Sequence, residues 1–299
     1  MRLGALVVFG LIGLPGLGLV STATAQLMRP SCTPVSMSLG ITPTAPGGTG
    51  LGDFPVFVHY MVNEDRRNDD PTAEFPPAAL AGHFAPGGAF NRIWGAHGIT
   101  FVLVGAEKCP YKVRSLDPNF TTRRERFPRP DANPKLPLTV FGLYNARHYQ
   151  VGPGTRPFKG LDLYIFSDIE DAAGYGSSPK FKTVAGVQRI ETEGGVLLGP
   201  DCKTRSNGEG CGRAFAHEAG HFLSLCHCCT TEADPNLRRQ WSTCTTSSCP
   251  GFVAAGTDLP DCGSSAGLAE RLMAANWLHA KLEACEIAQA TSFATRILQ

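Results

Sequence analysis

His217-Glu218-Ala219-Gly220-His221-Phe222-Leu223-Ser224-Leu225-Cys226-His227 is the stretch around which this chain is expected to fold. Two histidines four residues apart lie on the same face of an α-helix, so the imidazoles of His217 and His221 can bind one zinc ion. Glu218 lies between them, where its carboxylate can accept a proton from a water molecule at the metal. The motif therefore predicts metal-assisted hydrolysis of an amide bond, with Glu218 as the catalytic residue.

The predicted helix must end soon after His221 if His227 is to bind the same ion. A continuous helix would carry His227 about 9 Å along the axis beyond His221, since each residue rises about 1.5 Å. It could not then reach a zinc ion held by the other two histidines at about 2 Å. We therefore expect the helix to end near Leu223 or Ser224 and the chain to turn back. One Zn²⁺ ion would then be held by His217, His221 and His227.

This pattern resembles the motif of the metzincin zinc metallopeptidases, H-E-x-x-H-x-x-G-x-x-H. The residues that match are His217, Glu218, His221 and His227. Ser224 stands where the family has glycine, the residue that adopts a left-handed turn without strain. The resemblance implies an α/β (α+β) catalytic domain with a twisted mixed sheet, an active-site helix, a Met-turn and a C-terminal helix. It also implies an endopeptidase that acts on a protein or peptide substrate.

Two further features of the family have counterparts in the chain. By resemblance, Met273 in the segment 270–275 is the methionine of the Met-turn, a hydrophobic floor beneath the ligands, and a helical run follows at 277–298. By resemblance, Val196, Leu197 and Leu198 form the sheet edge that pairs antiparallel with the substrate. An Ala-Gly-Tyr sequence precedes this edge, an order most similar to the pappalysin-type branch of the family.

The rest of the chain predicts several strands and one further helix. Apolar and β-branched runs predict strands at 54–62, 99–104, 138–144, 161–167 and 195–199. Phe90, Ile93, Trp94 and His97 recur at helical spacing and predict a helix between the first two strands, with His97 as a helix-end residue. Because such a crossover joins them, these two strands are expected to pair in parallel. The glycine-rich residues 172–176 are expected to form a turn.

The N-terminus predicts export from the cytoplasm. Residues 1–25 combine Arg2, a long apolar run and the small residues Ala23-Thr24-Ala25, which together are typical of a cleaved signal peptide. Residues 26–52 are expected to be an extension or linker, and residues 53–299 the catalytic domain. No later stretch is apolar enough to span a bilayer, so we expect a secreted or periplasmic protein without a membrane partner after signal cleavage.

The chain has 11 cysteines, which in an exported protein predicts several disulfides. Cys202 with Cys211 is a plausible small loop, and Cys228 or Cys229 could pair with later cysteines. A second, structural metal site that uses Cys226, Cys228 and Cys229 is the alternative reading of that cluster. Cys32 is expected to form a disulfide, or else to bind the zinc ion in a latent form.

The formal net charge of +1 gives no indication of a nucleic-acid partner. No acidic loop of the EF-hand type is present, so calcium binding is possible but not indicated. Three alternative functions remain open on the sequence. The first is a catalytically inactive binding protein with the metzincin fold. The second is a gluzincin-like metallohydrolase with Glu283 or Glu286 as the third ligand, and the third is a hydrolase of a non-peptide bond.

Overall fold

The computed structural model describes residues 32–36, 52–66, 69–112, 127, 135–144, 159–169, 173–200, 202, 210–225, 273, 281–282 and 284–298. Three segments lie outside the described residues: the expected signal peptide, most of the 26–52 extension, and residues 226–272, which include His227. Within the described part, no helix has both the length and the hydropathy needed to cross a bilayer.

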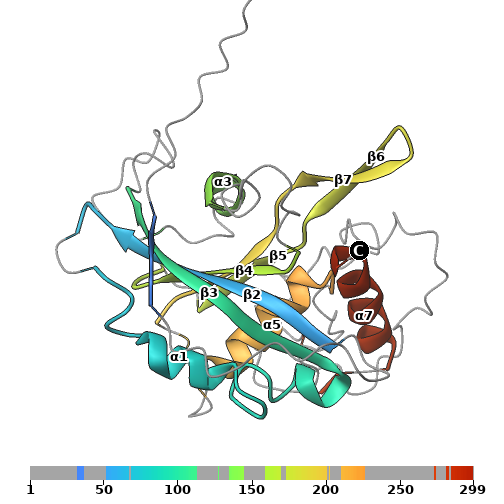
Figure 1. Ribbon diagram of the computed structural model, residues 1–299, viewed down its shortest axis with the longest axis horizontal. Coiled ribbons are helices and arrows are strands. Elements are labelled where there is room, and N and C mark those ends of the chain that lie inside the picture. Colours follow the sequence, from blue (N-terminus) through green and yellow to red (C-terminus); the bar gives the residue numbers. More distant parts are fainter. Residues whose placement is uncertain are drawn as a thin grey trace, which may run out of the picture.

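A six-stranded mixed sheet forms the centre of the fold (Figure 1). Its strands, in spatial order, are β1 (Thr33–Pro34), β3 (Ile99–Tyr111), β2 (Gly52–Asn63), β4 (Leu161–Phe166), β8 (Gly195–Leu198) and β5 (Gly174–Ser177). The four inner strands are parallel, and β1 and β5 are antiparallel to their neighbours at the two edges. The predicted strands at 54–62, 99–104, 161–167 and 195–199 and the predicted parallel pairing are therefore confirmed.

Strand β8 lies inside the sheet and not at its edge. It pairs in parallel with β4 and antiparallel with β5, and Val196, Leu197 and Leu198 are fully buried. The prediction that these three residues form a free edge for substrate is wrong, because both sides of β8 already have a strand partner. The outer strand is β5, which occupies residues that the sequence predicts as a turn.

Helices cover both faces of the sheet. The structure contains α1 (Pro77–His83), the short 3-10 helix η1 (Trp94–His97), α3 (Lys135–Tyr144), α5 (Cys211–Phe222) and α7 (Ala284–Leu298). Helices α1, α5 and α7 contribute to the core on one face, and α3 packs on the other (Figure 1). Between β5 and β8 the chain forms a separate hairpin of β6 (Lys180–Val184) and β7 (Val187–Thr192).

Three predictions for these segments need correction. Residues 138–144 belong to helix α3 and not to a strand, because Leu136, Val140 and Tyr144 recur every four residues and are buried together on one helix face. Only residues 94–97 of the expected 90–97 helix are helical, and the preceding residues form turns. Helix α7 begins at Ala284 rather than at Trp277, since residues 281–282 are not helical.

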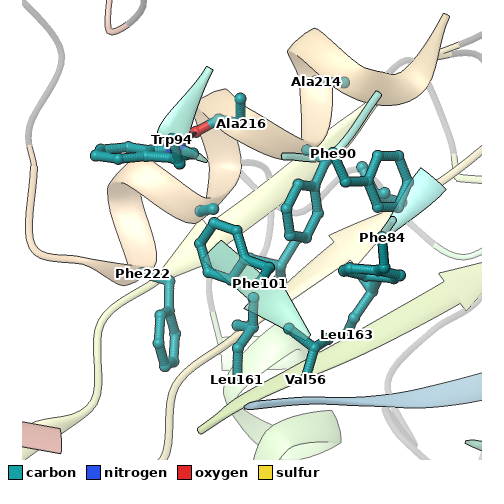
Figure 2. Packing of buried hydrophobic residues seen from close by; sticks show 14 of the residues in the cluster. Val56, Phe84, Phe90, Trp94, Phe101, Leu161, Leu163, Ala214, Ala216 and Phe222 are labelled. Carbon is teal, nitrogen blue, oxygen red and sulfur yellow. Dashed lines mark hydrogen bonds between the residues drawn. The ribbon is translucent and has the colours of Figure 1, made fainter. Parts of the chain in front are cut away.

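The main hydrophobic core lies between the sheet and α5 (Figure 2). Phe215 of α5 stacks on Phe90, with ring centroids 4.5 Å apart, and meets Phe84 and Phe101 edge-on at 5.7 and 5.1 Å. All four side chains are almost completely buried. Burying one such ring stabilises the fold by about 1.5–3 kcal/mol, so this cluster holds α5 firmly against the sheet.

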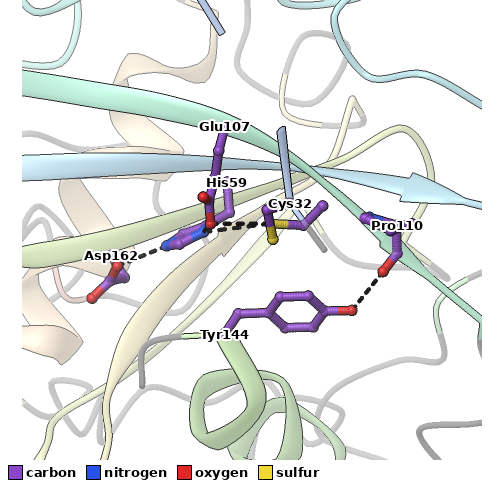
Figure 3. Close-up of polar contacts among 7 residues, drawn as sticks. Cys32, His59, Glu107, Pro110, Tyr144 and Asp162 are labelled. Carbon is purple, nitrogen blue, oxygen red and sulfur yellow. Dashed lines mark hydrogen bonds and ion pairs between the residues drawn. A yellow bond between two sulfur atoms is a disulfide. The ribbon is translucent and has the colours of Figure 1, made fainter. Parts of the chain in front are cut away.

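The opposite face of the sheet holds a buried polar cluster that the sequence does not predict (Figure 3). His59 in β2 is fully buried, and its two ring nitrogens lie 2.7 Å from Asp162 and 2.9 Å from Glu107. Burial alone would lower the pKa of His59, but hydrogen bonds and charges from the two carboxylates outweigh burial and raise it. The sequence does contain one signal for this cluster: a histidine and an aspartate each interrupt an otherwise apolar strand. Because buried charged groups need partners, these two side chains could have been expected to meet.

Two disulfides are present among the described residues. Cys32 is bonded to Cys109, which fastens the segment around β1 to β3. Of the two roles expected for Cys32, the structure therefore has the disulfide. Cys202 is bonded to Cys211 at the start of α5, as the sequence predicts. Cys226, Cys228 and Cys229 lie outside the described residues.

Candidate metal centre

Helix α5 brings three potential metal ligands together. One ligand atom each from His217, Glu218 and His221 lies within 4.8 Å of the others. The two imidazole rings are 4.9 Å apart between centroids and nearly perpendicular, at 88°. His217 is almost fully buried, and the other two are partly exposed. The predicted helix and the shared face of its two histidines are confirmed.

Contacts along its buried side fix the position of α5. The Trp94 indole N–H donates to the carbonyl oxygen of Ala216 at 2.9 Å, one residue before His217. Met273 is fully buried, and a Cβ placed on Gly220 would lie only 2.4 Å from its sulfur. Gly220 is thus the point at which Met273 packs directly against the helix that carries the three potential metal ligands.

Strand β5 runs directly against the other side of the motif. A Cβ on Gly176 would lie 2.1 Å from the backbone oxygen of Glu218 and 2.9 Å from the Cβ of His221. A Cβ on Gly174 would lie 2.9 Å from the Cγ of Glu218. At Gly176 the two backbones approach too closely for any side chain, and a Cβ at Gly174 would overlap the Glu218 side chain and the Leu197 backbone oxygen. The glycine-rich segment is therefore a contact surface for the motif.

The close approach of β5 changes the pKa of the Glu218 carboxyl group. Burial raises its pKa from the ordinary value to about 8, although a hydrogen bond from the Gly176 backbone acts in the opposite direction. The side chain is only partly exposed, and a carboxyl group whose pKa lies near neutrality is a candidate for proton transfer, because it can both accept and release a proton.

Helix α5 ends just before Ser224, as the sequence predicts. Phe222 is its last residue, and Ser224 has a φ of 69°, in the left-handed region. The Leu225 N–H donates to Gly220 and the Ser224 N–H donates to His221, at 2.8 and 3.0 Å. This pair of hydrogen bonds is the Schellman motif, which is usually built on glycine. The predicted turn at Ser224 is confirmed, and a serine occupies the strained position.

The same turn sets the orientation of His221. Its Nδ1 lies 2.9 Å from the carbonyl oxygen of Leu225, and because a carbonyl only accepts, Nδ1 must carry the proton. The neutral ring then has its lone pair on Nε2, the form that binds metal ions. Burial lowers the pKa of His221, partly offset by the Leu225 hydrogen bond, and so favours this neutral ring.

The donor set fits a zinc ion. Neutral imidazoles are preferred zinc ligands, and here one of them is already held in the required tautomer by a backbone carbonyl. Glu286, proposed as the third ligand of a gluzincin-like site, is buried in α7 and does not belong to the ligand cluster. Glu283 and His227 lie outside the described residues.

A cavity of about 280 Å³ lies at the N-terminal end of α5, apart from the ligand cluster. Its lining residues are Ala89, Arg92, Ile93, Ala96, His97, Gly212 and Arg213. His97 lines this cavity and ends η1, which agrees with its expected place at a helix end.

Neither the models of protein families nor the curated proteins gave a match. The functional interpretation therefore depends on the geometry of the site itself.

Proposed function

We propose that this protein is an exported zinc-dependent endopeptidase of the metzincin type. The observation that carries the proposal is the His217, Glu218 and His221 cluster on a helix that stops at a left-handed Ser224. A helix ending at this point gives the chain the reversal that His227 needs in order to approach the same ion. His217, His221 and His227 are proposed as zinc ligands, and residues 53–299 as the catalytic domain.

Glu218 is the proposed general base. A bound zinc ion would supply polarisation of the scissile carbonyl and a lowered pKa for a water molecule. Glu218 would accept the proton of the attacking water and pass it to the leaving amine. The hydrogen bond from the Gly176 backbone would orient its carboxylate toward that proton.

Strand β5 is the proposed binding edge for the substrate, in place of β8. It is the outermost strand on its side of the sheet, its residues are all partly exposed, and its backbone contacts Glu218. An extended peptide could add to this edge by backbone hydrogen bonds. Met273, which is buried against Gly220, is the proposed floor of the metal site.

The proposal is tested with the secreted protein and two variants, Glu218→Ala and His227→Ala. We expect the wild type to cleave denatured casein, to lose activity with a zinc chelator and to regain it with zinc. Glu218→Ala should retain bound zinc but lose at least about 100-fold in rate, since general acid–base groups contribute about 10²–10⁴-fold. His97→Ala is a matched control for histidine removal, and its zinc content should not change.

The outcomes separate the remaining possibilities. Zinc binding without cleavage of any peptide by the wild type would indicate a binding protein, and cleavage of a non-peptide substrate alone would indicate another hydrolase. Unchanged zinc content and activity in His227→Ala would refute the three-histidine site.

A further inference from the structure

The turn that ends α5 is held by side chains from two distant parts of the chain. The Gln289 side chain in α7 donates its Nε2–H to the carbonyl oxygen of Ser224 at 2.6 Å, and both residues are buried. The Ser178 hydroxyl, just after β5, donates to the carbonyl oxygen of His221, also at 2.6 Å. The last turn of the metal-binding helix is thus fastened to the end of β5 on one side and to α7 on the other.

The turn needs this support because its central residue is strained. Among the described residues, Ser224 and Ala185 are the non-glycine residues with positive φ, and Ala185 belongs to the β6–β7 hairpin turn. A side chain in the left-handed region is held there only when the surrounding structure imposes it. Ser224 is buried, so its carbonyl oxygen cannot rely on solvent for a hydrogen bond.

The supported peptide unit leads directly to a proposed zinc ligand. The peptide between Ser224 and Leu225 is bonded at both ends, its carbonyl to Gln289 and its N–H to the Gly220 oxygen. The next carbonyl, that of Leu225, accepts the hydrogen bond from His221 Nδ1, which places the proton on Nδ1 and the lone pair on Nε2. Displacing this peptide would therefore rotate the carbonyl that orients the His221 ring.

We propose that Gln289 is a positioning residue for the metal site, acting through the Ser224–Leu225 peptide and the Leu225 carbonyl on His221. This inference rests on the proposed zinc site. Gln289 takes over the role that glycine would have at Ser224, because it stabilises a left-handed turn that glycine would adopt without help.

Zinc affinity of the full secreted chain tests this role, measured by competition with a chromogenic zinc chelator at a temperature where every variant is folded. Gln289→Met removes the donor and keeps an unbranched side chain of similar length. It should weaken zinc binding by about tenfold or more, as the loss of a group that orients a ligand commonly does. Ala288→Met introduces the same side chain at the preceding, exposed position of α7 and should bind zinc as the wild type does.

A rescue experiment separates positioning from general packing. In the double variant Ser224→Gly with Gln289→Met, zinc affinity should return to within about threefold of the wild type, because glycine adopts the left-handed turn without strain and the carbonyl that has lost Gln289 accounts only for the remaining difference. If Gln289→Met alone does not fold, the double variant is compared with Ser224→Gly, and the two zinc affinities should agree within about threefold. Wild-type affinity in folded Gln289→Met, or weak binding that glycine does not restore, would refute the role of Gln289.

The same measurements distinguish this inference from the proposed activity. A wild-type protein that binds zinc but cleaves no peptide would refute the peptidase and leave the role of Gln289 intact. A peptidase whose zinc affinity is the same in Gln289→Met would keep its proposed function and lose only this positioning residue.

Discussion

Replacement of Gly176 by alanine is expected to separate β5 from the metal-binding helix. The added Cβ would stand 2.1 Å from the backbone oxygen of Glu218 and 2.8 Å from its backbone carbon. A Cβ essentially never lies closer than 3.0 Å to another heavy atom, so the first contact must lengthen by about 0.9 Å. Both atoms belong to the helix backbone, and no rotation of a side chain can relieve the overlap.

The displacement sets the size of two effects. Overpacking of this kind costs about 1–3 kcal/mol in the free energy of unfolding. A shift of about 1 Å at a catalytic group can lower the rate about 100-fold, and here the shift also weakens the Gly176 hydrogen bond to Glu218. We therefore expect Gly176→Ala to be both less stable and nearly inactive.

Urea unfolding and casein cleavage measure the two effects. Gly82→Ala in α1 is the matched control, because a Cβ at that position meets nothing within 4 Å. Alanine in a helix should raise stability there by up to about 1 kcal/mol and leave the rate unchanged. Wild-type stability and turnover in Gly176→Ala would refute the close packing of β5 on the motif.

Further predictions concern the core of the fold. Gly220→Ala should push Met273 away from α5 and lower the free energy of unfolding by about 1–3 kcal/mol. A double-mutant cycle with Met273→Ala should show a coupling energy of at least about 0.5 kcal/mol, and additive effects would refute the contact. The raised pKa of His59 predicts stability that is complete below pH 6.5, the ordinary value, and falls by up to about 1.4 kcal/mol per pH unit as pH rises through the folded-state pKa. The free energy of unfolding of His59→Gln should not show this dependence on pH. An unchanged dependence would refute the assignment of the effect to His59. Cys32→Ser should lose up to about 4 kcal/mol through its bond to Cys109, and the loss should vanish when both proteins are compared under reducing conditions.

The sequence predicts the part of the site that depends only on residue spacing within the motif itself. The spacing of His217 and His221 requires a helix, and the position of His227 requires that helix to end near Ser224, which it does. The inner strands are predictable because parallel strands buried on both faces consist of nearly continuous apolar residues.

The remaining features depend on contacts between segments far apart in the chain. Gly174 and Gly176 have the composition of a turn, but both adjoin Glu218: a Cβ at Gly176 would overlap its backbone, and a Cβ at Gly174 would overlap its side chain. Pairing of that segment with β8 makes it the edge strand, and no local pattern predicts this pairing. The bond from Gln289 to Ser224 spans 65 residues and likewise has no local signal.

Helix α3 shows the same limit on local reasoning. Thr139, Val140 and Phe141 favour a strand by their β-propensity. The segment is helical because Leu136, Val140 and Tyr144 bury one helix face against the sheet. Packing across the sheet outweighs the local preference, which sequence reasoning on a single segment does not capture.

The most direct test of the central claim is the rate of casein cleavage by Glu218→Ala and by the wild type at equal zinc occupancy. If Glu218 is the general base of a zinc peptidase, both proteins bind one zinc ion per chain and only the wild type cleaves, with a difference of at least about 100-fold. Cleavage by Glu218→Ala at the wild-type rate would contradict the account.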